Sequence, residues 1–126
     1  MSTLRVSTLA NQGGTQSTAI ENAINGSAKA WVNFNGTGTV AVRASYNVSS
    51  ITDNGNGDYT VNFTNAMPDV NYSVVGACGT GAAGNDDFFL TTNYNVASTT
   101  SAARLGAFRG SSAITDAAWV SVAIFR

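Results

Sequence analysis

The sequence predicts an all-β protein, a β-sandwich of about eight short antiparallel strands preceded by an extended N-terminal segment. Three observations point to this fold class. From residue 28 onward apolar and polar residues alternate, which is the period of a half-buried strand. Turn signals recur at intervals of roughly 8–12 residues, and helical periodicity is confined to one short stretch. The 126 residues suffice for one such domain.

Residues 1–27 differ from the rest because their apolar residues stand isolated among polar and glycine positions. Within them, residues 17–25 predict a short helix with Ser17 as its N-cap and Gly26 as its terminator. No apolar period lasts long enough to bury a face within one chain. The segment is either a disordered leader or a stalk ordered only by partner chains. We adopt the second interpretation, with residues 28–126 as the sandwich domain.

The first half of the domain predicts four strands. Ala30, Val32 and Phe34 share one face of the first strand, and Tyr59 to Phe63 shows the cleanest alternation in the chain. Between them, the Asn-, Asp- and Gly-rich cluster at 53–58 predicts a turn that tolerates positive φ. The predicted strands cover residues 30–35, 39–43, 46–51 and 59–63.

The second half predicts four more strands, separated by a glycine-rich loop at 79–84 and a polar loop at 93–100. The last strand is strongly apolar, and such a strand would invite aggregation as an open edge. We therefore expect it to lie centrally in its sheet or under a neighbouring subunit. The lone cysteine, Cys78, is expected to be a small buried hydrophobe. The predicted strands cover residues 70–78, 86–92, 103–108 and 119–125.

Composition excludes several classes of function. Only 10% of residues are charged, the net charge is −1, and no basic stripe offers a surface for duplex nucleic acid. Histidine is absent, which removes the commonest general base and metal ligand. No apolar run is long enough to cross a bilayer, so membrane insertion is not expected. The N-terminus lacks the apolar core of a signal peptide, so synthesis in the cytoplasm is expected.

Several stretches resemble a recurring module of phage tail fibre proteins, particularly those of marine and cyanobacterial phages. The longest is the run AWVNFNGTGTV from Ala30 to Val40 with the residues just before it, and the others are 46–55, 57–63 and 66–72. The resemblance covers roughly residues 25–76 and the C-terminal strand. It implies a homotrimeric β-rich distal domain of a fibre, located in the virion. Residues 1–27 would then serve trimer assembly and contact other virion proteins.

The function implied by this resemblance is host attachment by receptor binding, with a cell-surface glycan as the candidate receptor. One alternative is a capsid or baseplate decoration protein with a purely structural role. A less favoured alternative is a polysaccharide-degrading spike, which would need two placed carboxylates. The neighbouring pair Asp86 and Asp87 would point to opposite faces of a strand. We therefore expect a protein that is not an enzyme.

The candidate receptor contacts lie in and beside the predicted loops of the second half. In Asn93-Tyr94-Asn95 an aromatic ring is flanked by amides, which suits a glycan that needs a flat surface and hydrogen-bond partners. Arg104 and Arg109 could add charge-assisted contacts to acidic sugars. The set comprises Asp86, Asp87, Asn93, Tyr94, Asn95 and Arg109.

Three other features have a structural and a functional interpretation. Gly79 to Gly84 reads GxGxxG, but a strand-like run follows where a dinucleotide site needs a helix, so we expect no cofactor. The carboxylates of Asp86 and Asp87 are expected to end a solvated strand, with an ion held between chains as the alternative. Trp31 and Trp119 lie opposite the smaller aliphatic residues of their strands. We expect both to pack in the core or between subunits, with sugar stacking as the alternative.

Overall fold

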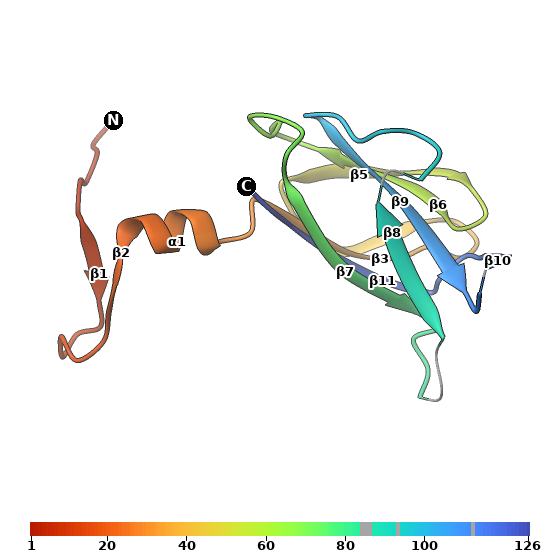
Figure 1. The fold of residues 1–126 in the computed structure, drawn as a ribbon, viewed down its shortest axis with the longest axis horizontal. Helices are drawn as coiled ribbons and strands as arrows, with labels where there is room; N and C mark the ends of the chain where they lie inside the picture. Colours follow the sequence, from red (N-terminus) through yellow and green to blue (C-terminus); the bar gives the residue numbers. More distant parts are fainter. Residues whose placement is uncertain (84–86, 93, 112) are drawn as a thin grey trace.

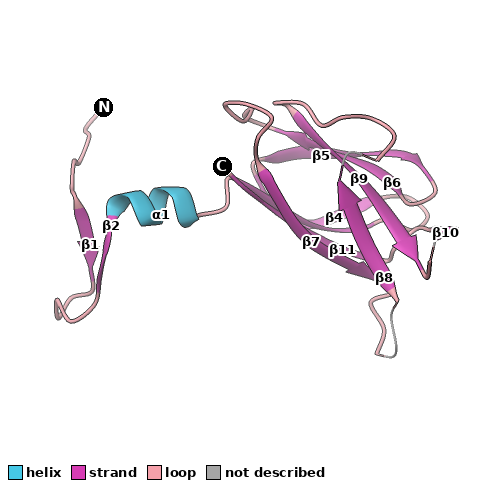
Figure 2. Ribbon diagram, viewed as in Figure 1, coloured by secondary structure: helices cyan, strands magenta, loops and turns pink. Residues whose placement is uncertain are grey.

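The computed structural model describes residues 1–126 except 84–86, 93 and 112, and it shows a β-sandwich with a separate N-terminal element (Figure 1). Two antiparallel sheets form the sandwich, as the sequence predicts. Strands and loops make up almost all of the described chain, and α1 is the helix seen among them (Figure 2). No described helix has the length and apolar character needed to span a membrane.

The N-terminal element comprises a small hairpin and a short helix. Strands β1 (Thr8–Ala10) and β2 (Ser17–Ala19) pair, and α1 (Ile20–Gly26) leads toward the sandwich (Figure 1). The prediction of Ser17 as an N-cap is wrong, because Ser17 pairs with Ala10 in the hairpin. The helix begins three residues later, and its N-cap position, Ala19, makes no side-chain hydrogen bond. Gly26 is the last helical residue, close to the predicted end.

The first sheet has the order β4 (Ala41–Tyr46), β3 (Ala30–Asn35), β11 (Trp119–Phe125) and β7 (Ser73–Gly79). The predicted bounds of β3 and β11 are confirmed to the residue. Strand β11 lies between β3 and β7, which confirms its expected central place. The predicted strand at 39–43 is displaced, because Gly38 takes a positive φ of 63° in the preceding turn.

The second sheet has the order β5 (Val48–Gly55), β6 (Asp58–Phe63), β9 (Ala102–Arg109), with β8 (Phe88–Thr92) on the far side of β9. The short β10 (Ala113–Ile114) continues along β9 beyond the end of β6.

Two turns differ in length from the sequence prediction: the turn between β5 and β6 is shorter, and the corner before β7 is longer. The predicted turn at 53–58 contracts to Asn56 and Gly57, since β5 extends to Gly55 and β6 begins at Asp58. Gly57 has a φ of 65°, a backbone conformation that favours glycine. Strand β7 begins three residues later than predicted, at Ser73, because the corner after Pro68 is longer. In that corner Asp69 accepts a hydrogen bond from the backbone N–H of Asn71.

A single residue, Asn47, carries the chain from the first sheet to the second. It follows β4 directly, precedes β5 and has a φ of 54°. Its side-chain amide donates to the carbonyls of Lys29 and Asn65 at 3.0 and 3.1 Å, and its oxygen accepts from the N–H of Asn65 at 2.8 Å. At the opposite edge β8 follows β7 from one sheet to the other (Figure 1). Both edges of the sandwich are therefore crossed by the chain.

The core lies between the sheets and consists of the inward residues of alternating strands. Tyr59 is its largest fully buried side chain and meets Phe34 edge-on, with ring centroids 5.2 Å apart. Cys78, predicted to be buried, is half-buried and packs against this core. The fully or nearly buried apolar residues are Ala30, Val32, Phe34, Tyr59, Val61, Phe63, Met67, Ala103, Leu105, Ala107, Ala117, Val120, Val122 and Ile124.

The hydroxyl of Tyr59 joins two loop segments inside the core, one at Gly36 and one at Asp116 and Ala117. It lies 3.1 Å from the carbonyl oxygen of Gly36 and 3.1 Å from Oδ1 of Asp116, and it accepts from the N–H of Ala117 at 3.3 Å. A Cβ on Gly36 would lie 2.3 Å from this hydroxyl, so the position admits only glycine. Burial raises the pKa of Tyr59 well above its ordinary value of 10.

Candidate binding face

The outer face of the sheet β4–β3–β11–β7, here called the tryptophan face, carries both tryptophans of the chain. Val32 and Val120 point into the core, so Trp31 and Trp119 on the alternate positions point outward. Their residues are 41% and 46% exposed. The expectation that they pack in the core is therefore wrong. Packing between subunits and sugar stacking both remain predictions.

A chain of hydrogen bonds crosses three strands of the tryptophan face. Asn33 of β3 donates from Nδ2 to the Ser121 hydroxyl of β11 at 2.6 Å. Its Oδ1 accepts from Nη1 of Arg43 of β4 at 3.3 Å. The register of β3 and β4 shifts between Asn33 and Phe34, and Arg43 is the extra residue at this irregularity. The bulge thus lets Arg43 reach over the same face as Asn33 and Ser121.

Arg43 also stacks on one of the two tryptophans. Its guanidinium carbon lies 4.5 Å from the ring centroid of Trp119, and Nη2 donates to the carbonyl oxygen of Ala118 at 2.7 Å. No carboxylate pairs with Arg43 among the residues that the structure describes. A cation on an indole ring is stabilised by the ring quadrupole.

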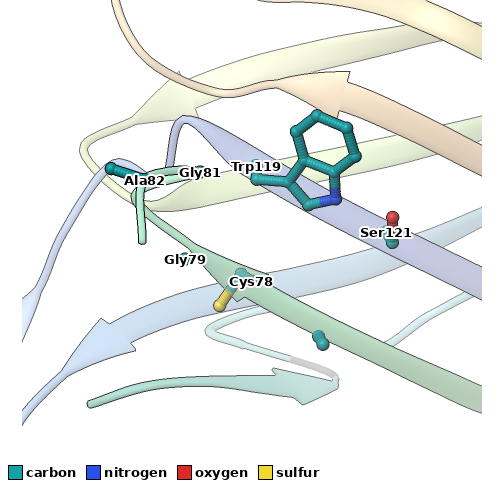
Figure 3. Close-up of a pocket in the computed structure, with 7 residues that line it drawn as sticks. Cys78, Gly79, Gly81, Ala82, Trp119 and Ser121 are labelled. Carbon is teal, nitrogen blue, oxygen red and sulfur yellow. The ribbon is translucent and has the colours of Figure 1, made fainter. Parts of the chain in front are cut away.

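Two shallow hollows adjoin Trp119 and Trp31. The first, of about 240 Å³, lies between Trp119 and the turn that follows β7, with Ala77 and Ser121 at its base. Trp119 and Ser121 project to this side of the sheet, whereas the sulfur of Cys78 points away from it (Figure 3). The second, of about 570 Å³, runs beside Trp31. Its lining residues on the outer face are Trp31, Asn33, Val75, Ala77, Ser121 and Ala123.

The predicted receptor contacts Asp87 and Arg109 come together at one end of the β8–β9 pair. Nε of Arg109 lies 3.2 Å from Oδ1 of Asp87, and both side chains are more than half exposed. The guanidinium carbon of Arg109 is 5.7 Å from the ring centroid of Phe88. Arg104, by contrast, is held in the sheet by Asp58, with Nε to Oδ1 at 2.6 Å and Nη2 to Oδ2 at 2.7 Å. Its charge is therefore already compensated.

The other predicted contacts divide between half-buried and exposed positions. Tyr94 packs edge-on against Phe108 at 5.4 Å and covers Gly106, where a Cβ would lie 2.8 Å from its ring. Phe108 in turn stacks on Phe89 at 5.2 Å. Asn95 is exposed and takes a φ of 55°. Asp86 and Asn93 lie outside the described residues.

Arg43, Asn33 and Ser121 were not among the binding residues predicted from the sequence. A signal was present for two of them, because Asn33 and Ser121 each follow an outward tryptophan by two positions in a strand. No sequence pattern pointed to Arg43, because its position on the tryptophan face depends on the bulge between β3 and β4. Within the described chain, no three His, Cys, Asp or Glu side chains are grouped as a metal site would need.

Comparisons with protein-family models, with curated proteins and with solved structures gave no match to this chain.

Proposed function

We propose that this protein is a tail fibre domain of a phage virion, a homotrimer that contributes to host attachment by binding and without catalysis. The likeness of residues 25–76 to tail fibre modules supports the fibre assignment. The assembly assignment rests on one structural observation. The apolar residues of the N-terminal element lie exposed in the single chain, with Leu4 86%, Leu9 47% and Ile24 55% exposed.

An element of this size has little stability of its own. Strands of three residues and a helix of seven fall below the lengths at which isolated hairpins and helices persist in water. The helix α1 contains no buried residue. Packing of the exposed leucines and Ile24 against the same segment of two other copies would supply the missing burial. This arrangement favours a stalk over residues 1–27, which would also join the domain to other virion proteins.

Molecular mass in solution tests the assembly. We expect three copies of the 12.9-kDa chain by light scattering at micromolar concentration. The triple variant Leu4→Ser, Leu9→Ser, Ile24→Ser should shift the mass toward the monomer while the sandwich keeps its circular dichroism. Val70→Ser, at a position that is 54% exposed outside the stalk, serves as the control. A stable wild-type monomer would contradict the proposal.

Binding of the fluorescently labelled full chain to host cells tests attachment. Saturable binding supports a fibre, whereas a trimer that binds no host cell and localises to the capsid or baseplate would make the protein a decoration protein. New reducing ends released from host envelope polysaccharide would instead indicate a degrading spike.

A further inference from the structure

We propose that the tryptophan face binds an acidic polysaccharide, with a sugar ring against Trp119 and an anionic group on Arg43. This inference rests on the proposed attachment function and gives its receptor a chemical class. It also places the binding on the outer face of the β4–β3–β11–β7 sheet, away from the β8–β9 residues that the sequence suggested.

The surroundings of Trp119 suit a flat, partly apolar ring. Arg43 covers one side of the indole, and the hollow of about 240 Å³ opens beside it. That hollow is also lined by Gly79, Gly81 and Ala82, and the two glycines have no side chain to fill the space (Figure 3). Sugar rings present C–H groups on their faces, and an exposed indole offers them a rigid apolar surface.

The polar side chains of the tryptophan face offer mostly hydrogen-bond donors to a ligand. The indole N–H groups of Trp31 and Trp119 have no hydrogen-bond partner among the residues described here. Ser121 accepts from Asn33, which leaves its own hydroxyl proton for a ligand. Arg43 uses two of its five N–H groups within the protein. Such a set matches a ligand rich in oxygen acceptors, as a saccharide with carboxylate or sulfate groups is.

Charge complementarity selects an acidic ligand over a neutral one. Arg43 is the sole charged residue in the four strands of this sheet, whose residues are all described. A guanidinium forms paired hydrogen bonds with carboxylate, sulfate and phosphate oxygens. Because Asn33 and Trp119 already hold the guanidinium in place, a ligand would pay little side-chain entropy to engage it.

A second copy of the chain is the competing occupant of the tryptophan face. If another subunit covered the face, Arg43 would be buried without a carboxylate from its own sheet, and burying an unpaired charge is costly. A subunit could bind there only by supplying a carboxylate from a different surface. An acidic saccharide brings the counter-charge itself.

The test measures binding of the full chain to four polymers by isothermal titration calorimetry. Alginate carries carboxylates, heparin carries sulfates, dextran is neutral, and poly-glutamate is anionic without sugar rings. We expect binding to alginate or heparin that weakens with added salt, and at least tenfold weaker binding to dextran and poly-glutamate. Equal binding to poly-glutamate would overturn the role of the sugar ring.

Variants locate the site on the molecule. Arg43→Gln and Trp119→Ala should each weaken binding at least tenfold, and Arg43→Lys should lie between Arg43→Gln and wild type. Phe89→Ala, which removes an exposed aromatic from the other sheet, is the matched control and should bind as wild type does. Circular dichroism and molecular mass of every variant are recorded in the same buffer.

Three results would overturn the inference and leave the proposed function standing. Loss of binding in Arg109→Gln with none in Arg43→Gln would move the site to the β8–β9 end. Dissociation of the trimer by Arg43→Gln or Trp119→Ala would show that a second copy covers the face. Attachment to host cells without affinity for any of the four polymers would exclude an acidic saccharide. Failure of the wild type to attach to host cells would instead count against the proposed function.

Discussion

Tyr59→Phe removes one oxygen from the centre of the sandwich and should destabilise the fold measurably. The ring and its contact with Phe34 remain, so the packing of the core is unchanged. What is lost is the hydroxyl shared by Gly36, Asp116 and Ala117. Ala117 is fully buried, so its N–H is left without an acceptor. A buried donor without a partner costs about 1–3 kcal/mol, and we expect the loss in the free energy of unfolding to lie in this range.

The same substitution should change how stability depends on alkaline pH. The pKa of Tyr59 is raised in the folded protein, chiefly by burial, with the charge of Asp116 adding to the effect. Above its ordinary value of 10, the unfolded chain therefore loses the phenol proton while the folded chain retains it. Unfolding is favoured as pH rises from about 10 toward the folded pKa. In Tyr59→Phe this part of the alkaline destabilisation should be absent. The part that comes from Tyr72, whose pKa burial also raises, should remain.

Urea denaturation followed by tryptophan fluorescence measures both effects, at neutral pH and between about pH 9 and 11. One protein concentration is used throughout, because assembly contributes to apparent stability. A loss below about 0.5 kcal/mol at neutral pH would refute the hydrogen-bond argument, since no buried N–H would then be left unsatisfied. An unchanged alkaline slope would refute the assignment of the raised pKa to Tyr59.

Substitutions at Phe63, Asn47 and Asp58 test separate parts of the fold by the same assay. Phe63→Ala should cost about 3–5 kcal/mol because the ring is nearly buried between the sheets, and a near-zero loss would contradict the register of β6. Asn47→Ala should lower the free energy of unfolding more than Asn47→Gly does. Both variants lose the side-chain hydrogen bonds of the corner, but only glycine readily adopts its positive φ. Equal losses in the two variants would show that the positive φ of residue 47 does not contribute to the difference. Asp58→Asn should cost about 3 kcal/mol by leaving the charge of Arg104 uncompensated in the sheet. Asp69→Asn, which breaks the exposed pair with Arg126, should have a much smaller effect, and the reverse order would contradict the burial argument.

Local residue patterns predicted some elements of the fold accurately, whereas tertiary contacts decided the bounds of others. Strands β3 and β11 were predicted to the residue, because each combines strict alternation with β-branched and aromatic residues. The start of α1 was misplaced, since the pairing of Ser17 with Ala10 overrides its capping preference. The change of sheet at Asn47 was not predicted either. Asparagine occurs in many turns, and only the neighbouring carbonyls of Lys29 and Asn65 select this one as a corner.

The candidate sites divide in the same way. Asp87 and Arg109 were identified from their residue types, and the antiparallel register of β8 and β9 brings them into contact. The tyrosine of the polar loop was identified from its amide neighbours, yet Gly106 and Phe108 hold its ring half-buried. Arg43 was missed because a bulge in the pairing of β3 and β4, which no local pattern announces, carries it onto the tryptophan face.

The sequence by itself determined the fold class, most strand positions and the face of each strand on which a side chain lies. It could do so because side-chain direction in a strand alternates with a period of two, a property of neighbouring residues alone. The tertiary structure decided which strands are neighbours. Asn33 meets Ser121 across 88 residues of chain, and Arg43 reaches Trp119 through the same pairing of β4, β3 and β11. Such contacts depend on the packing of the whole chain, which local residue patterns do not encode.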